Sequence, residues 1–209
     1  YEGGVIYVTP SFQRSYTYQE NSVKPLIESA VMENGMPHFL GPIVTRVLDQ
    51  EGSFEKALLI DGNQRLITLL MLLIALRDVM EKDHPQEALG LHTLCFAAPK
   101  GAPGTFKNIV SRHDRAVFEA AASATPLPET NHPLAKVYLQ SHKAFAEIPA
   151  KRHPQILERL LCDFTFVVFA MTTEDDPYPI FKLFNPGEEE AARVGRDSYR
   201  EYAVSYTHL

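Results

Sequence analysis

The pattern of apolar and polar positions changes most abruptly between residues 57 and 82. Residues 57–60 are an apolar run of the kind that forms a short buried strand, and the five residues after it are polar or glycine. The chain then becomes almost wholly apolar, as in a helix that is buried on nearly all sides. The pattern predicts a strand at 57–60, a polar turn at 61–65 and a central helix over about 64–82.

Other apolar runs predict further elements. β-Branched and aromatic runs predict strands, and amphipathic runs bounded by Gly, Pro or capping residues predict helices. The predicted strands are residues 5–8, 39–47, 91–96 and 164–171, with a polar turn at 49–53 between the second strand and residues 57–60. The predicted helices are residues 23–34 (capped by Ser22), 114–122, 133–148, 154–162 and 180–184 (capped by Thr173).

Composition places the chain among ordinary globular proteins. It has 209 residues, of which 45% are hydrophobic and 22% charged, enough for one large domain. The net charge of −6 argues against a general nucleic-acid coat and leaves nucleic-acid contacts to local patches. Cys95 and Cys162 fit no metal or redox spacing, so we expect reduced core residues in a cytoplasmic protein. The apolar run 66–76 is too short to span a bilayer.

The 61–65 turn admits two interpretations. In the first it is a nucleotide site: the N-terminus of the helix holds phosphate, Gly62 permits a close backbone approach, and Arg65 binds phosphate oxygens. Asp61 then holds Mg²⁺ or positions an attacking water. In the second, Asp61 is only the helix N-cap and Arg65 is its ion-pair partner.

Four blocks of sequence carry a resemblance to a known family. Residues 10–18 are similar to P-x-[aromatic]-Q-R-x-Y-x-W, residues 39–44 to F-L-G-x-I-V, residues 60–68 to I-D-G-Q-Q-R-L-T-T and residues 180–187 to I-F-x-x-[LI]-N-x-x-G. In this order they resemble the N-terminal domain of GmrSD-type, modification-dependent restriction endonucleases, a ParB/sulfiredoxin-like domain. The departures are Asn63 in place of Gln, Tyr18 in place of Trp and Ile67 in place of Thr.

The resemblance implies an α+β fold, in which a small mixed sheet packs on the buried helix and a mainly helical section follows over about 110–163. This domain would occupy residues 1–187. Residues 188–209 have no clear periodicity, and we expect a non-native or disordered tail there. The resemblance also places an HNH nuclease domain further along the chain, outside this fragment.

The implied activity is NTP binding and Mg²⁺-dependent NTP hydrolysis in a restriction system that defends against phage and acts on modified DNA. The resemblance implies catalytic roles for Asp61, Gln64 and Arg65, with Asp61 as the Mg²⁺ ligand. The nucleotide-binding residues that it implies are Gln13, Arg14, Gly62, Asn63 and Asn185. The partners that we expect are an NTP, DNA contacted through the full-length protein, and a second copy of the chain, with no membrane contact.

Several alternatives stay open. The domain could be a non-catalytic nucleotide switch, or a ParB-like nuclease, although the sequence lacks the clustered carboxylates or histidines of a nuclease metal site. Lys107 and residues 112–115 form a basic cluster that is either a nucleotide or DNA contact or a solvated helix start capped by Asp114. Asn185 is either a site residue or a helix stop. The chain has no zinc spacing, no P-loop and no Cys-His-Arg signature of the kind sulfiredoxins use.

Overall fold

A computed structural model describes residues 5–10, 13–17, 20–33, 35–51, 54–97, 105–106, 108–172, 174–175 and 179. Within these residues, a five-stranded mixed sheet has the strand order β6-β1-β3-β2-β7, and β4 pairs with β5 in a separate two-stranded sheet. The strands are β1 Val5–Val8, β2 His38–Glu51, β3 Phe54–Asp61, β4 Phe96–Ala97, β5 Thr105–Phe106, β6 Asn108–Ile109 and β7 Phe164–Met171. The helices are α1 Glu20–Val31, α2 Asn63–Met80, α3 Pro85–Cys95, α4 Arg115–Ala122, α5 Pro133–Ala146 and α6 His153–Cys162, with a 3₁₀ turn at Ala150–Arg152.

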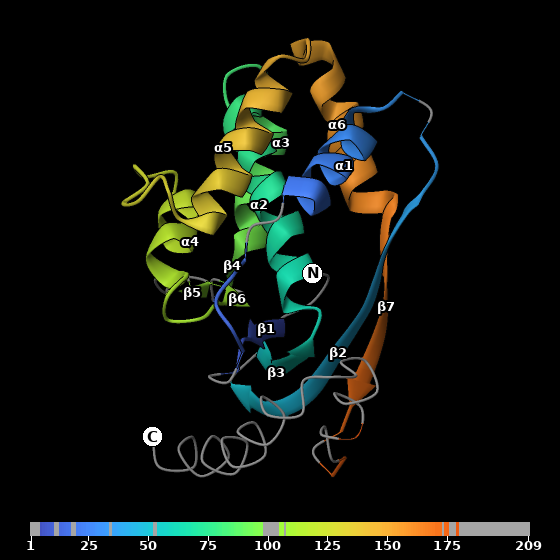
Figure 1. Ribbon diagram of the computed structural model, residues 1–209, viewed down its shortest axis with the longest axis vertical. Coiled ribbons are helices and arrows are strands. Elements are labelled where there is room, and N and C mark those ends of the chain that lie inside the picture. Colours follow the sequence, from blue (N-terminus) through green and yellow to red (C-terminus); the bar gives the residue numbers. More distant parts are fainter. Residues whose placement is uncertain are drawn as a thin grey trace.

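The sheet is built around the antiparallel β2–β3 hairpin. Strand β1 runs parallel to β3, and β7 runs parallel to β2 over its whole length. Figure 1 shows β2 and β7 side by side, reaching away from the helices that gather around α2. The α+β architecture, with a mixed sheet packed on a buried helix and a helical section after it, is therefore confirmed.

Helix α2 is the centre of the core. Every residue from Leu66 to Arg77 is buried, because α3, α4, α5 and α6 pack around it and apolar residues of the sheet (Ile43, Leu59 and Phe164) belong to the same core. A helix in this position has no solvent face and needs no polar stripe, which is why its sequence is apolar all round. The expected central helix at about 64–82 is confirmed to within two residues.

The β2–β3 hairpin is longer than the apolar pattern predicts. The expected turn at 49–53 was wrong in its first part, since Asp49 pairs with Lys56 and Gln50 with Glu55. These polar pairs extend the ladder to the end pair Glu51–Phe54, through residues whose polar side chains give no strand signal in the sequence. The strands predicted at 5–8 and 164–171 are confirmed residue for residue.

Two helical regions correct the sequence interpretation. The strand expected at 91–96 is wrong, because α3 runs to Cys95; Ala88 and Leu91 lie three residues apart and are buried together against α2. Helix α1 begins at Glu20, so Ser22 lies inside its first turn and does not cap it. The predicted helix at 180–184 and its cap at Thr173 lie outside the described residues.

Two arginines, one at the start of α6 and one within it, form hydrogen bonds with the C-terminal end of α1. Arg152 donates to the Val31 carbonyl (2.7 Å), and Arg159 donates to the carbonyls of Ser29 (3.2 Å) and Gly35 (3.0 Å). Cations stabilise the carbonyls and the negative dipole end of a helix C-terminus. The α1–α6 junction is thus held by charge-assisted bonds.

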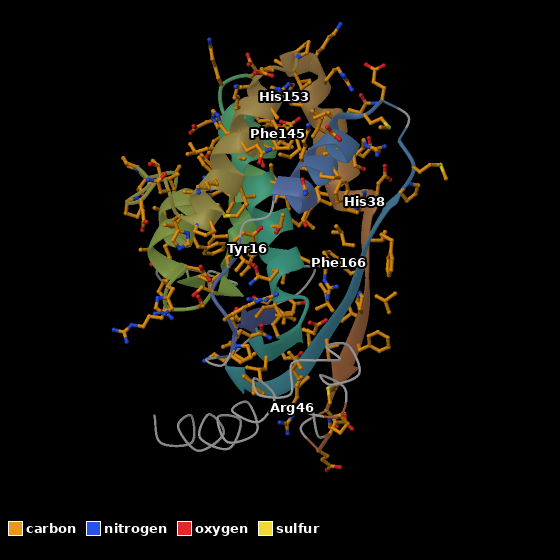
Figure 2. The ribbon with its side chains drawn as sticks, viewed as in Figure 1. Tyr16, His38, Arg46, Phe145, His153 and Phe166 are labelled. Atoms are coloured by element: carbon orange, nitrogen blue, oxygen red, sulfur yellow. The ribbon has the colours of Figure 1, made fainter. Side chains whose placement is uncertain are left out.

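The α5–α6 junction is held by a buried histidine. His153 Nε2 lies 3.1 Å from the carbonyls of both Phe145 and Ile148, so this nitrogen carries the proton and donates (Figure 2). Cys162, at the end of α6, is a free and exposed cysteine, so the expected core position is wrong for it. The side chain of Cys95 lies outside the described part. Among the described helices, none is both long and apolar enough to cross a bilayer.

Candidate functional site

The turn predicted at 61–65 is shorter in the structure: only Gly62 lies between β3 and α2, and residues 63–65 already belong to the helix. The name 61–65 turn is kept for this stretch. Strand β3 ends at Asp61, and Gly62 occupies the N-cap position of α2 with a φ of 91°. The Gly62 carbonyl accepts the first helical bond, from Leu66 N–H (3.0 Å), and glycine at the N-cap has no side chain that could cap this end of the helix. The backbone N–H groups of the first turn therefore have no helical acceptor and no bond from the N-cap residue, as in an anion site.

Asp61 and Arg65 form an ion pair across the turn. Arg65 Nη2 lies 2.8 Å from Asp61 Oδ2, with both side chains partly buried. The N-cap role considered for Asp61 is wrong, because Gly62 holds that position, but the pairing of Asp61 with Arg65 is confirmed. Arg65 also lies against Gly41, where an added Cβ would be 2.9 Å from Arg65 Nη1. The backbone of β2 therefore leaves room for the guanidinium.

The backbone of Gly62 packs closely against β2. A Cβ at this position would lie 3.1 Å from the Pro42 carbonyl oxygen and 3.0 Å from a side-chain carbon of Ile43. The positive φ independently favours glycine. Packing between β2 and the turn thus accounts for the glycine without any ligand.

Asn63 is the first residue of α2 and is only 3% exposed. Its Oδ1 accepts a bond from the Thr9 hydroxyl (2.9 Å), whereas its Nδ2 has no hydrogen-bond partner among the described residues. A buried donor without an acceptor costs about 1–3 kcal/mol. The Asn63 side-chain amide at the N-terminus of α2 is therefore a donor that a bound acceptor would stabilise.

Loop 13–17 lies against the 61–65 turn. Gln13 Nε2 donates to the Ile60 carbonyl (2.8 Å). The Gln64 amide bonds the loop backbone at both of its ends, accepting from Thr17 N–H (3.0 Å) and donating to the Ser15 carbonyl (3.4 Å). The family resemblance placed Gln13 and the turn in one site, and the two do lie side by side. Gln64 binds the backbone of the loop that carries Gln13.

The other predicted site residues are dispersed. Arg14 is exposed on loop 13–17, and Asn185 lies outside the described residues. In the basic cluster, Arg112 and Arg115 are exposed, whereas Asp114 is fully buried and binds the Tyr16 backbone. Asp114 stands at the N-cap position of α4, as one of the two alternatives had it, but its side chain makes no cap bond.

Thr9 and Thr68 are two further partners of the turn that were not among the predicted site residues. Thr68 donates to the Gln64 carbonyl (2.7 Å) and lies 2.6 Å from the Tyr16 hydroxyl, beside α2 (Figure 2). A signal for Thr68 was present, since it is the polar residue in the apolar run 66–76 and a buried hydroxyl needs a partner. Thr9 offered no such signal, because its partner Asn63 is 54 positions away.

A cavity of about 520 Å³ lies between the sheet, α2 and α6. Its walls are apolar apart from Tyr7, Thr45 and Cys162, and it reaches α2 at Leu66, next to the turn. In the described part of the chain, no three His, Cys, Asp or Glu side chains lie close enough together to hold a metal ion. A metal at the turn would therefore take one carboxylate, Asp61, from the described residues.

A family model described as the N-terminal domain of GmrSD restriction endonuclease matches residues 1–190. The chain belongs to this family. No curated protein matches the chain. In this GmrSD N-terminal domain, the blocks at 10–18 and 39–44 both converge on the block at 60–68, through loop 13–17 and through the contacts of β2 with Gly62 and Arg65. The block at 180–187 lies outside the described residues.

Proposed function

We propose that this GmrSD N-terminal domain binds and hydrolyses an NTP at the 61–65 turn, as the regulatory module of a modification-dependent restriction system. The observation that carries the proposal is the buried Asn63 amide, whose N–H donor has no acceptor among the described residues and lies at a helix N-terminus with glycine as its N-cap. Donors of this kind are satisfied by phosphate oxygens, and Arg65 adds a cation within the same turn.

Each residue of the turn has a role in this proposal. The first-turn N–H groups and Asn63 bind phosphate, and Arg65 exchanges its partner Asp61 for phosphate oxygens. Asp61 is then free to position the attacking water or to hold Mg²⁺ together with the phosphates; one carboxylate is a normal protein contribution to nucleotide-bound Mg²⁺. The ion, when bound, neutralises negative charge on the phosphates.

The proposed association with DNA rests on the family and not on residues of the 61–65 turn. Membership in a restriction endonuclease family implies association with DNA. The net charge of −6 supports contact through local patches or through other parts of the full-length protein. Cleavage belongs to the HNH domain that the family resemblance implies, and nucleotide turnover here would regulate it.

A second candidate is a nucleotide switch without turnover. It is favoured by the partners of the polar side chains, since Asp61 is paired with Arg65 and both ends of the Gln64 amide are bound to loop 13–17. Such a site can bind phosphate while lacking a free base to activate water.

Phosphate release from four ribonucleoside triphosphates with Mg²⁺ separates the two candidates. We expect Asp61→Asn and Arg65→Gln to reduce turnover by about 100-fold or more, as loss of transition-state charge stabilisation does. Asp83→Asn and Lys82→Gln make the same charge changes at exposed positions beyond the other end of α2, and should leave turnover unchanged. Binding that depends on Arg65 without any phosphate release would support the switch. Absence of both binding and turnover would refute both.

A further inference from the structure

Asp114 has the environment of a positioning residue. Its carboxylate is 0% exposed, and it accepts the Tyr16 backbone N–H at both oxygens (3.0 and 3.2 Å) and the Ser111 hydroxyl at Oδ2 (2.5 Å). His132 Nε2 lies 3.6 Å from Oδ1. His132 Nδ1 accepts the Leu134 N–H, so the ring proton of the neutral form is on Nε2, facing Asp114.

Burial of a carboxylate is costly unless specific bonds compensate for it, and removing one partner of such a group is strongly destabilising. Asp114 makes no cap bond to α4. Besides the nearby Ser111 and His132, its carboxylate binds the backbone of loop 13–17 at Tyr16, which is 98 positions away in sequence.

Tyr16 also connects loop 13–17 to α2. Its ring is 4% exposed, and its hydroxyl lies 2.6 Å from Thr68 Oγ1. Thr68 donates its own proton to the Gln64 carbonyl, so Tyr16 is the donor in the Tyr16–Thr68 bond. Tyr16 is therefore held at its backbone by the start of α4 and at its hydroxyl by the first turns of α2, and the loop residues on either side of it bond to Gln64.

We infer that Asp114 is a positioning residue of the nucleotide site. Through Tyr16 it holds loop 13–17, so that Gln13 stays bonded to the Ile60 carbonyl beside the 61–65 turn. This inference rests on the proposed function and extends it, because it makes a residue of the helical section part of the same site. Asp114 acts on the nucleotide only through the loop and does not contact it.

Asp114→Asn tests this inference, since it keeps the volume of the side chain and removes its charge. Hydrogen exchange should become faster for the Tyr16 and Thr17 amides, while the amides in the middle of α2 keep their protection. Calorimetric titration with non-hydrolysable analogues of the four ribonucleoside triphosphates and Mg²⁺ should show roughly tenfold weaker binding. Asp83→Asn, an exposed carboxylate, is the matched control and should change neither quantity.

A double variant separates positioning from general loss of stability. Gln13→Ala should weaken binding in the wild-type background and have much less effect when combined with Asp114→Asn, because the loop is already released. Unchanged loop exchange, unchanged affinity or fully additive effects would each overturn the inference. If the wild-type chain binds none of the analogues, the proposed function fails and the positioning role fails with it. Binding by the wild type that Asp114→Asn leaves intact refutes only the positioning role.

Discussion

Glycine at position 62 satisfies two constraints that no other residue meets together. The φ of 91° lies in the left-handed region, which disfavours any side chain with a Cβ. A Cβ would also lie 3.1 Å from the Pro42 carbonyl oxygen, which is backbone and cannot rotate away. Gly41 meets a related pair of constraints, with a φ of 101° and the Arg65 guanidinium beside it. The turn and β2 are therefore fitted to each other.

We predict that Gly62→Ala lowers the free energy of unfolding by about 1–3 kcal/mol, the usual cost of a strained backbone position. Gly90→Ala is the matched control. Gly90 lies inside α3, with no atom within 4 Å of an added Cβ, so alanine there should stabilise by about 0.5–1 kcal/mol. Urea unfolding of the three proteins measures both changes. Equal effects of the two substitutions would contradict the strain at Gly62.

At the scale of elements, a buried ionic group ties α2 to two other helices. Arg77 is 4% exposed and donates to the Ala121 carbonyl (2.7 Å) and, more closely, to the Ala122 carbonyl, at the end of α4. It also pairs with Asp78 (2.7 Å), whose other oxygen accepts from the Tyr138 hydroxyl of α5 (2.7 Å). The end of α2 is thus bonded to α4 and α5.

Alkaline pH should weaken the α2–α5 connection. Burial, and then the bond to Asp78, raise the pKa of Tyr138 well above its ordinary value of 10.0. Above about pH 10 the unfolded chain ionises this phenol while the folded chain keeps it protonated, so the stabilisation is complete below pH 10 and is lost as pH rises.

We predict that Tyr138→Phe costs about 1.5–3 kcal/mol at neutral pH, the value of a hydrogen bond to a charged group. The difference from wild type should shrink above pH 10, because phenylalanine cannot ionise. The pKa of Tyr7 is raised too, by burial and then by Glu55, but both proteins share that contribution and it cancels. Urea unfolding at pH 8 and pH 10.5 measures the difference, and a constant difference would be evidence against the shifted phenol.

At the scale of the whole molecule, β7 leaves an apolar surface open. It is an edge strand of the described sheet, and its eight residues include no charged residue and no proline. Val167, Val168 and Phe169 are 46%, 57% and 44% exposed, and Phe39 of the neighbouring β2 is 62% exposed. Long apolar edges of this kind promote pairing between molecules.

We predict that the chain self-associates as its concentration rises and that Val167→Lys suppresses this, since a charged lysine on an edge strand opposes pairing. Leu89→Lys is the matched control, because Leu89 is 64% exposed but lies on α3. Sedimentation velocity over a concentration series measures the effect. Association that both substitutions reduce equally would place it elsewhere than β7.

Local rules alone predicted the elements whose neighbours in sequence decide their structure. Helix α2 was predicted because its apolar residues are consecutive, and β7 because β-branched and aromatic residues are. The 61–65 turn followed from its place between a strand and a helix. The same rules failed for α3, whose short apolar run fits either structure, and for the hairpin at residues 49 and 50, where polar pairs carry no hydrophobic signal.

The tertiary structure decided the partners. No local pattern links Asn63 to Thr9, or Asp114 to Tyr16, because these pairs are 54 and 98 positions apart. A hydrogen bond between distant residues depends on how the elements pack, and neither residue type reveals its partner. The sequence by itself thus determined where the polar turn lies and which family it resembles. Only the packing of β2, loop 13–17 and α4 around that turn decided which of its groups are bonded and which have no partner in the described part of the chain.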